Sequence, residues 1–352
     1  MSARLIPLSG VGHKGPACFL LETPNARLLL DLGEGPDVGQ RPDLRRVGRV
    51  DAILLSHAHP DHCGALDLAA QVGNPPIWAT ADVWWALGGA GHVLPQTGET
   101  QIAGLTVQSG RAGHAPGGVW LRVNIGGGLL YMGDHSNESR LYAFDPPPPS
   151  RCVVLDASYG LYDQAQAEAQ AALLPWAEAG ALFPVPAGGR GPEMAVWAAA
   201  AGLPFAVDDA VRDMMLWLLG RGHESLRPGA DVGLRHALAK AEPLGAPVAT
   251  FAAKPNATGG AAARLIPAWQ AAGRPIVFTG YVAAQSPAEA LVSAGEAEVV
   301  RWNVHPRLSD LTALVRAVGA TQVIPAFGDA RHLPGWRAAF QPAETLLEAV
   351  SL

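Results

Sequence analysis

The stretch LSHAHPDHCGAL, residues 55–66, places three histidines and an aspartate within six positions. Apolar residues precede and follow this polar cluster, so both of its ends are tied to segments that should pack into a core. Polar groups of this kind are unfavourable beside a core unless they bind something. Neutral imidazole nitrogen and carboxylate oxygen are preferred ligands of Zn²⁺ and neighbouring divalent ions. We therefore predict a metal site, rather than a solvated loop, at His57, His59, Asp61 and His62.

Two residues further along the chain extend this cluster. His114 lies in the turn RAGHAPGGVW, residues 111–120, and Asp134 ends the apolar run in LLYMGDHS, residues 129–136. Taken alone, a single histidine or a strand-end aspartate is more often structural. Their order after the first cluster, each at the end of an expected strand, favours ligands instead. Six ligands exceed the four of a closed structural zinc site and indicate a centre for two ions.

The chain changes its pattern at about residue 161. Before it, short apolar runs alternate with Gly-rich turns, and the GGG of residues 126–128 is typical of a hairpin turn. A helix is expected from about Gly64. After residue 161, helical stretches alternate with short strands, which indicates a parallel sheet with helices on its faces. The expected strands are 27–31, 50–56, 106–109, 119–125, 129–133 and 152–156, and then 181–187, 204–209, 247–253 and 275–280.

Length and composition limit the classes of function. The 352 residues fit two domains of ordinary size, and 49% hydrophobic residues supply large cores. The net charge is −6, from 25 Lys and Arg against 31 Asp and Glu, so any phosphate contact must be local. Three cysteines without a C-x-x-C pair argue against a disulfide framework or a thiolate zinc site.

The N-terminus and the apolar runs give no sign of a secretory signal or a membrane span. MSARLIPLSG at the N-terminus does not have the charged and apolar regions of a secretory signal. No uninterrupted apolar stretch reaches the ~20 residues that span a membrane. We therefore expect a cytoplasmic protein without a membrane partner.

The order of the motifs resembles the metallo-β-lactamase superfamily. LLLDLGE, residues 28–34, supplies an early Asp31, and the His/Asp cluster, His114 and Asp134 follow in order. The resemblance implies an α/β fold, an αββα sandwich with metal ions at strand ends, in which Asp31 orients the ligands through hydrogen bonds. Two such ions lower the pKa of a shared water and stabilise the negative charge that develops in the transition state. Both effects suit hydrolysis. The resemblance assigns His57, His59 and His114 to the first ion, Asp61 and His62 to the second, and Asp134 to both.

The second half resembles the β-CASP nucleases, a family that includes the J-type ribonucleases and the cleavage-and-polyadenylation endonuclease. The resemblance lies in VVLDASYG (153–160), KPNATGGAAAR (254–264), IVFTGYVAAQS (276–286) and a closing run that begins RWNVHPRL (301–308). Their acidic residue falls on Asp156 and their histidine on His305. The resemblance implies a metallo-β-lactamase domain from residues 1–160 and 301–352, with a β-CASP domain, an α/β unit with a parallel sheet, inserted at 161–300.

The implied activity is that of a ribonuclease that cleaves single-stranded RNA with two divalent ions, Zn²⁺ or Mn²⁺. Asp61, His305 and Asp156 are its candidate catalytic residues, with His305 protonating the leaving oxygen or gripping the scissile phosphate. Lys254 and Arg264 are candidates for binding substrate, and a homodimer is a candidate assembly. The alternatives are a hydrolase of small lactones or thioesters, a DNA-repair nuclease, and a non-catalytic relative that binds nucleic acid.

One position departs from the family pattern. The family presents a histidine in a VHGE-like turn as the last ligand of the second metal, but the turn IPAFGDARH, residues 324–332, has Phe327 there. A phenyl ring cannot coordinate a metal. We therefore expect a weak second site, unless His332, five residues further on, turns in as an extra ligand. Open, oxygen-rich coordination favours Mn²⁺ over Zn²⁺.

Overall fold

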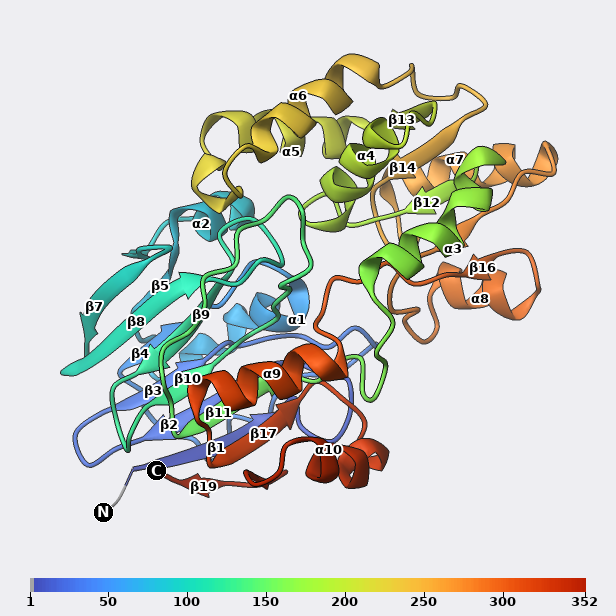
Figure 1. Cartoon of the computed structure of the whole chain (residues 1–352). Coiled ribbons are helices and arrows are strands. Elements are labelled where there is room, and N and C mark those ends of the chain that lie inside the picture. The colour runs from blue at the N-terminus through green and yellow to red at the C-terminus, as the bar shows by residue number, and fades with distance from the viewer. Residues whose placement is uncertain (1–2) are drawn as a thin grey trace. The chain divides into compact units, whose positions relative to one another are not determined.

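The computed structural model describes residues 3–352, which form two compact units (Figure 1). The first unit comprises the chain up to Asn137, Phe144–Asp163 and His305–Leu352, and the second comprises Glu138–Ala143 and Gln164–Val304. The second unit is thus an insertion between segments of the first. Residues 138–143, which were expected in the first domain, belong to the second unit. The domain borders expected from the sequence stay a prediction.

Two seven-stranded sheets form the first unit. One has the order β19-β1-β2-β3-β4-β5-β6, antiparallel from β19 to β3 and parallel from β3 to β6. The other has the order β18-β17-β11-β10-β9-β8-β7, antiparallel from β7 to β10 and parallel from β10 to β18. The strands are β1 (Arg4–Ser9), β2 (Cys18–Glu22), β3 (Arg27–Leu30), β4 (Ala52–Leu54), β5 (Ile77–Thr80), β6 (His92–Leu94), β7 (Gly98–Ile102), β8 (Leu105–Arg111), β9 (Val119–Val123), β10 (Leu129–Tyr131), β11 (Cys152–Asp156), β17 (Gln322–Ala326), β18 (Glu344–Thr345) and β19 (Val350–Ser351).

The two sheets enclose one core, and helices cover their outer faces. Alternation along β2 shows the layering, because Phe19 and Leu21 enter the core between the sheets while Cys18 and Leu20 face the other way. The outer face of the first sheet packs against η1 (Leu66–Val72) and α2 (Ala81–Leu87). The outer face of the second packs against α9 (Leu308–Val318) and α10 (Leu333–Ala339). This arrangement confirms the αββα sandwich.

The local elements largely follow the sequence pattern. The glycines at 126–128 all have positive φ, between 58° and 98°, which side chains rarely adopt, and they join β9 to β10 as the expected hairpin. The helix expected from about Gly64 is instead split. A short α1 (Pro60–Cys63) begins four residues earlier, because Pro60 at its first position suits a helix start, and the 3₁₀ helix η1 follows. A further 3₁₀ turn, η3 (Ala330–His332), precedes α10.

The second unit is built on a parallel sheet with the order β12-β14-β13, so the expected α/β insert is confirmed. Its two faces pack against different helices: Phe183, Phe205 and Phe251 join one core, and Leu182 and Ala252 join another. The first core includes α3 to α6, and the second includes α7 and α8. The elements are α3 (Gln166–Glu178), β12 (Leu182–Pro184), α4 (Arg190–Ala200), β13 (Phe205–Val207), α5 (Asp209–Gly220), η2 (His223–Ser225), α6 (Ala230–Lys240), β14 (Ala249–Ala252), α7 (Gly260–Ala271), β15 (Val277–Phe278), α8 (Pro287–Ser293) and β16 (Glu298–Val299).

Within residues 3–352, no helix combines the length and the apolar character that crossing a membrane requires.

Candidate metal centre

The candidate ligands lie where strands of the first unit end. His57, His59 and the short helix α1 follow β4, His114 lies between β8 and β9, and Asp134 follows β10. Two more residues of interest end or follow neighbouring strands: the polar Asp156 closes β11, and the apolar Phe327 follows β17. Because these strands run side by side in two facing sheets, their ends bring residues that are far apart in the sequence to one edge.

Backbone contacts hold the loop of residues 57–62 in place. The Ala17 N–H donates to the Asp61 carbonyl at 2.8 Å, and the Leu32 N–H donates to the His62 carbonyl at 3.0 Å. A Cβ atom on Gly33 would lie 1.8 Å from the Asp61 carbonyl oxygen, so only glycine permits this close approach. The loop is therefore fixed by its neighbours before any ligand binds.

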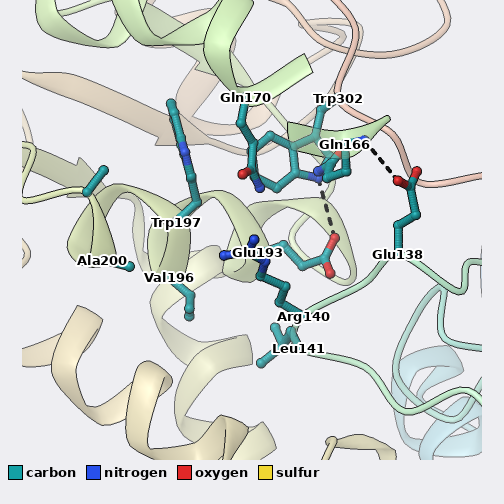
Figure 2. Close-up of a pocket in the computed structure, with 11 residues that line it drawn as sticks. Glu138, Arg140, Leu141, Gln166, Gln170, Glu193, Val196, Trp197, Ala200 and Trp302 are labelled. Carbon is teal, nitrogen blue, oxygen red and sulfur yellow. Dashed lines mark hydrogen bonds between the residues drawn. The ribbon is translucent and has the colours of Figure 1, made fainter. Parts of the chain in front are cut away.

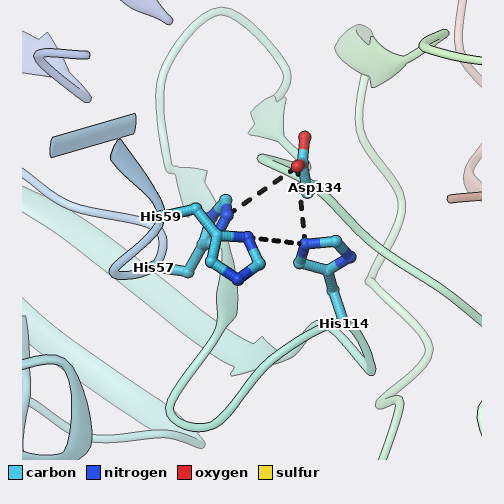
Figure 3. A group of neighbouring side chains, drawn as sticks. All are labelled: His57, His59, His114 and Asp134. Atoms are coloured by element: carbon cyan, nitrogen blue, oxygen red, sulfur yellow. Dashed lines mark hydrogen bonds and ion pairs between the residues drawn. The ribbon is translucent and has the colours of Figure 1, made fainter. Parts of the chain in front are cut away.

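The first group of ligands is rich in imidazole (Figure 3). Its ligand atoms all lie within 4.8 Å of one another. His114 Nε2 is 3.1 Å from His59 Nδ1, and Asp134 Oδ2 is 3.5 Å from His114 Nε2 and 3.7 Å from His57 Nε2. The group consists of His57, His59, His114 and Asp134.

The chemistry of this group fits a divalent metal ion. His57 Nε2 is buried and has no hydrogen-bond partner within residues 3–352, although it points at the other ligands. Burial, and next the charges of His62 and His59, lower the pKa of His57 well below its ordinary value, so its imidazole is neutral. Neutral imidazole is the form that binds a metal, and an unpaired buried nitrogen is unfavourable without one.

The second group shares Asp134 with the first and is poorer in imidazole. It consists of Asp61, His62 and Asp134, and His62 Nε2 lies 3.2 Å from Asp134 Oδ1. The Phe327 ring lies beside this group, with its centroid 5.0 Å from that of His62. The group can hold a cation, but the position expected to supply a further ligand is apolar.

A lysine that the sequence did not single out lies at the second group. Lys14 Nζ is 3.3 Å from Asp61 Oδ2 and 3.5 Å from Ser158 Oγ, and it lies 5.8 Å above the centroid of the Phe327 ring. Burial alone would lower the pKa of Lys14, but Asp61, Asp134 and Asp156 raise it above its ordinary value. The ammonium group is therefore charged. The only sequence signal was its rarity, because the chain has three lysines.

Asp31 contacts the candidate ligand His62 at Nδ1, the ring nitrogen that faces away from Asp134. Its Oδ2 lies 2.7 Å from His62 Nδ1 and accepts hydrogen bonds from Ser56 Oγ at 2.7 Å and Tyr131 Oη at 2.5 Å. Its Oδ1 accepts from the Ser56 N–H at 2.7 Å. The carboxylate thus fixes the His62 ring with Nε2 towards Asp134, which is the geometry that an orienting residue requires.

A third group places a histidine beside the shared aspartate. His305 Nδ1 is 2.7 Å from Asp156 Oδ2 and 3.7 Å from Asp134 Oδ2. Asp156 also accepts from the N–H groups of His135 at 3.2 Å and Ser158 at 3.1 Å. Burial alone would raise the pKa of Asp156, but His305 lowers it below its ordinary value, so the carboxylate is charged. The pair can orient an imidazole whose Nε2 is available for proton transfer.

Three other candidates lie outside these groups. The Nε2 atom of His332 lies 3.4 Å from Arg331 Nε, and the His332 ring packs 5.7 Å from Trp336, so His332 belongs to none of the three groups. Lys254 follows β14 and Arg264 lies in α7, both within the second unit. Their contact with substrate stays a prediction.

Comparisons with known proteins agree with this architecture. Residues 11–175 match the family model of the metallo-β-lactamase superfamily. A crystal structure of a protein of unknown function from Enterococcus faecalis V583 matches with a TM-score of 0.62 and 12% identity, over 100% of both chains, which supports the fold alone. The chain is therefore similar to the metallo-β-lactamase superfamily over residues 11–175, just under half of its length.

Similar curated proteins narrow the assignment. A ribonuclease from Thermus thermophilus is 29% identical over 45% of this chain and 44% of its own length. The transcription termination factor FttA of Methanothermobacter thermautotrophicus is 29% identical over 47% of this chain and 33% of its own. Subunit 2 of the cleavage and polyadenylation specificity factor of Oryza sativa is 40% identical over 24% and 12%. The matched segments span less than half of the length of each of these relatives.

Proposed function

We propose that this chain is a metal-dependent nuclease that hydrolyses phosphodiester bonds in single-stranded RNA. The main support for the proposal is that three groups of side chains share Asp134. One is rich in imidazole, one is rich in carboxylate, and the third pairs a histidine with an aspartate. The names of the similar proteins, a ribonuclease and a subunit of a cleavage and polyadenylation factor, support RNA as the substrate.

We assign the cation ligands by the chemistry of each group. His57, His59 and His114 would hold a tight ion together with Asp134, and Zn²⁺ suits this imidazole set. Asp61, His62 and Asp134 would hold a second ion weakly, because Phe327 supplies no ligand and the Lys14 ammonium already neutralises Asp61. The oxygen-rich second group suits Mn²⁺. Bound divalent cations supply a polarised phosphate and a water of lowered pKa.

The chain's own residues would position the proton transfers. Asp156 accepts from His305 Nδ1, which fixes the imidazole and leaves Nε2 to give a proton to the departing oxygen of the RNA. Asp134 Oδ2 lies 3.7 Å from the same Nδ1 and would also help to hold the ring during the transfer. Asp61 would be a ligand that also orients the attacking water by accepting its hydrogen bond. Lys254 and Arg264 are proposed to bind the RNA backbone.

Cleavage of labelled single-stranded RNA tests this proposal, with matched DNA, a lactone and a thioester assayed beside it. His59→Ala and Asp61→Ala should each abolish RNA cleavage while circular dichroism stays unchanged. His223→Ala, at an exposed histidine of the second unit, is the matched control and should cleave normally. Turnover of the lactone or thioester with RNA left intact would show a small-molecule hydrolase instead, and cleavage of DNA alone would show a DNA nuclease.

A cytoplasmic location and a homodimer remain proposals that rest on the sequence. Size-exclusion chromatography with light scattering tests the oligomeric state, and a single monomeric species at micromolar concentration would remove the dimer.

A further inference from the structure

A second concave site lies entirely within the second unit. It is a pocket of about 250 Å³ between the start of α3, the middle of α4 and the segment that carries Trp302 (Figure 2). Pockets for drug-sized ligands occupy ~300–1,000 Å³, so this volume suits a single planar ring with a short substituent. None of its lining residues belongs to the three groups around Asp134.

Two indole rings form the apolar walls of the pocket. Trp197 on α4 is half-buried, and Trp302 is buried, with their ring centroids 5.6 Å apart and the planes tilted by 66°. Glu193 Oε2 accepts a hydrogen bond from Trp302 Nε1 at 3.4 Å, which fixes that ring. Rigid indole faces favour a flat, conjugated ligand, because stacking orders few rotatable bonds.

The carboxylates beside the pocket are already engaged by the protein. Glu193 accepts from Ser139 Oγ as well as from Trp302. Glu138 accepts from the Gln166 N–H at 2.9 Å and from Asn303 Nδ2 at 3.1 Å. The acceptor groups of the site are therefore used internally, so a cationic ligand would compete with existing hydrogen bonds.

The polar groups of the pocket that the protein does not use are hydrogen-bond donors. Gln166 is 8% exposed, and its Oε1 accepts from the Asn303 N–H at 2.8 Å, which turns its amide nitrogen away from that contact. Across residues 3–352, this amide nitrogen has no hydrogen-bond partner, and neither does the side chain of Gln170 one turn along α3. Arg140 at the rim forms no ion pair within the described chain. These donors have no partner in the described chain, so a ligand with acceptor atoms can pair with them in the pocket.

We propose that this pocket binds a nucleotide through a keto-bearing base, with uracil the best fit to its size. The base stacks on Trp197, its carbonyl oxygens accept from the amides of Gln166 and Gln170, and its phosphate faces the Arg140 guanidinium. The choice of a nucleotide among flat, acceptor-rich molecules rests on the proposed function. In the proposed nuclease, this pocket would bind one base of the RNA at a position separate from the metal centre.

Calorimetric titration of the metal-free full-length protein with uridine 5′-monophosphate tests the proposal without requiring hydrolysis. Trp197→Ala should weaken binding by roughly 5- to 150-fold, the range expected for one base–aromatic stack. Trp85→Ala, at an exposed tryptophan of the first unit, is the matched control and should bind like the unchanged protein. Gln166→Glu keeps the acceptor for Asn303 but removes the donor, so it should also weaken binding.

The comparison of ligands separates the parts of the site. Uridine should bind more weakly than its monophosphate, and Arg140→Gln should abolish that difference while leaving uridine binding unchanged. Adenosine 5′-monophosphate should bind more weakly than the uridine nucleotide, because adenine has no carbonyl oxygen. No heat at millimolar nucleotide, equal binding in Trp197→Ala, or preferential binding of choline would each overturn the proposal. Because the metal is removed, failure here leaves the proposed cleavage reaction untouched, and failure of cleavage leaves this binding test valid.

Discussion

Replacing Lys14 should strengthen cation binding at the second group. Its ammonium group already neutralises the negative charge of Asp61 that would otherwise attract a metal ion. Lys14 Nζ lies 3.3 Å from Asp61 Oδ2, an oxygen that the second group needs as a ligand. At that distance a unit charge pair interacts by ~5 kcal/mol at an effective dielectric constant of about 20, and by ~1 kcal/mol in water. The Lys14 side chain is 19% exposed and can swing towards solvent, which places the expected gain near the lower figure.

We therefore expect Lys14→Met to bind the second Mn²⁺ roughly 10- to 100-fold more tightly, a gain of about 1–3 kcal/mol. The measurement is calorimetric titration of chelator-stripped protein with Mn²⁺ after the first site is filled with Zn²⁺. Lys14→Arg keeps the charge and serves as the matched control, so its second-site affinity should stay near that of the unchanged chain. An unaltered second site in Lys14→Met, or two equally tight sites in the unchanged protein, would refute the reasoning.

Three further changes test other contacts. Phe327→His should raise occupancy of the second site, measured as Mn²⁺ per chain, because it restores an imidazole beside His62; unchanged metal content would contradict this. His305→Ala should lower RNA cleavage by ~10²–10⁴-fold with metal content unchanged, and an undiminished rate would remove its role as the acid. Burial raises the pKa of Glu193 to about 7 from its ordinary 4.5, so the folded state holds a proton that the unfolded state releases between those values. Stability should therefore fall as pH rises from about 4.5 to 7, by a few kcal/mol in total, and Glu193→Gln should remove this slope in urea denaturation; an equal slope in both proteins would show that another group is responsible.

The candidate ligands that lie close together in the sequence were the easiest part of the candidate site to recognise. His57 to His62 lie on one short loop, so their chemistry is visible without knowledge of the fold. His114 and Asp134 needed the additional expectation that each ends a strand, and the strands expected near 119–125 and 129–133 do form β9 and β10. Position at a strand end was thus as informative as residue type.

The parts that the sequence did not predict depend on contacts between distant segments. Lys14 belongs to the loop between β1 and β2, two strands that were missed, and its partner Asp61 lies on a different element. β1 contains Pro7, which weakens its strand pattern, and β2 is a continuous apolar run that does not alternate. The pocket of the second unit is assembled from the segments around residues 140, 166, 197 and 302, whose meeting is a property of the fold.

Apart from the shared Asp134, the two candidate metal groups use different residues, so we expect a change at one position to alter one group and spare the other. The ligands of the first group come from the loops after β4, β8 and β10, whereas Phe327 follows β17 and has ring contacts with Phe19 and His62 in the described chain. The absence of an imidazole at Phe327 therefore concerns the second group. Burial alone would raise the pKa of Asp134, but His62 and His305 lower it well below its ordinary value, so the carboxylate common to both groups is charged. We therefore expect the first group to hold its cation, and His305 to keep its proposed acid–base role, although Lys14 and Phe327 occupy the surroundings of the second group.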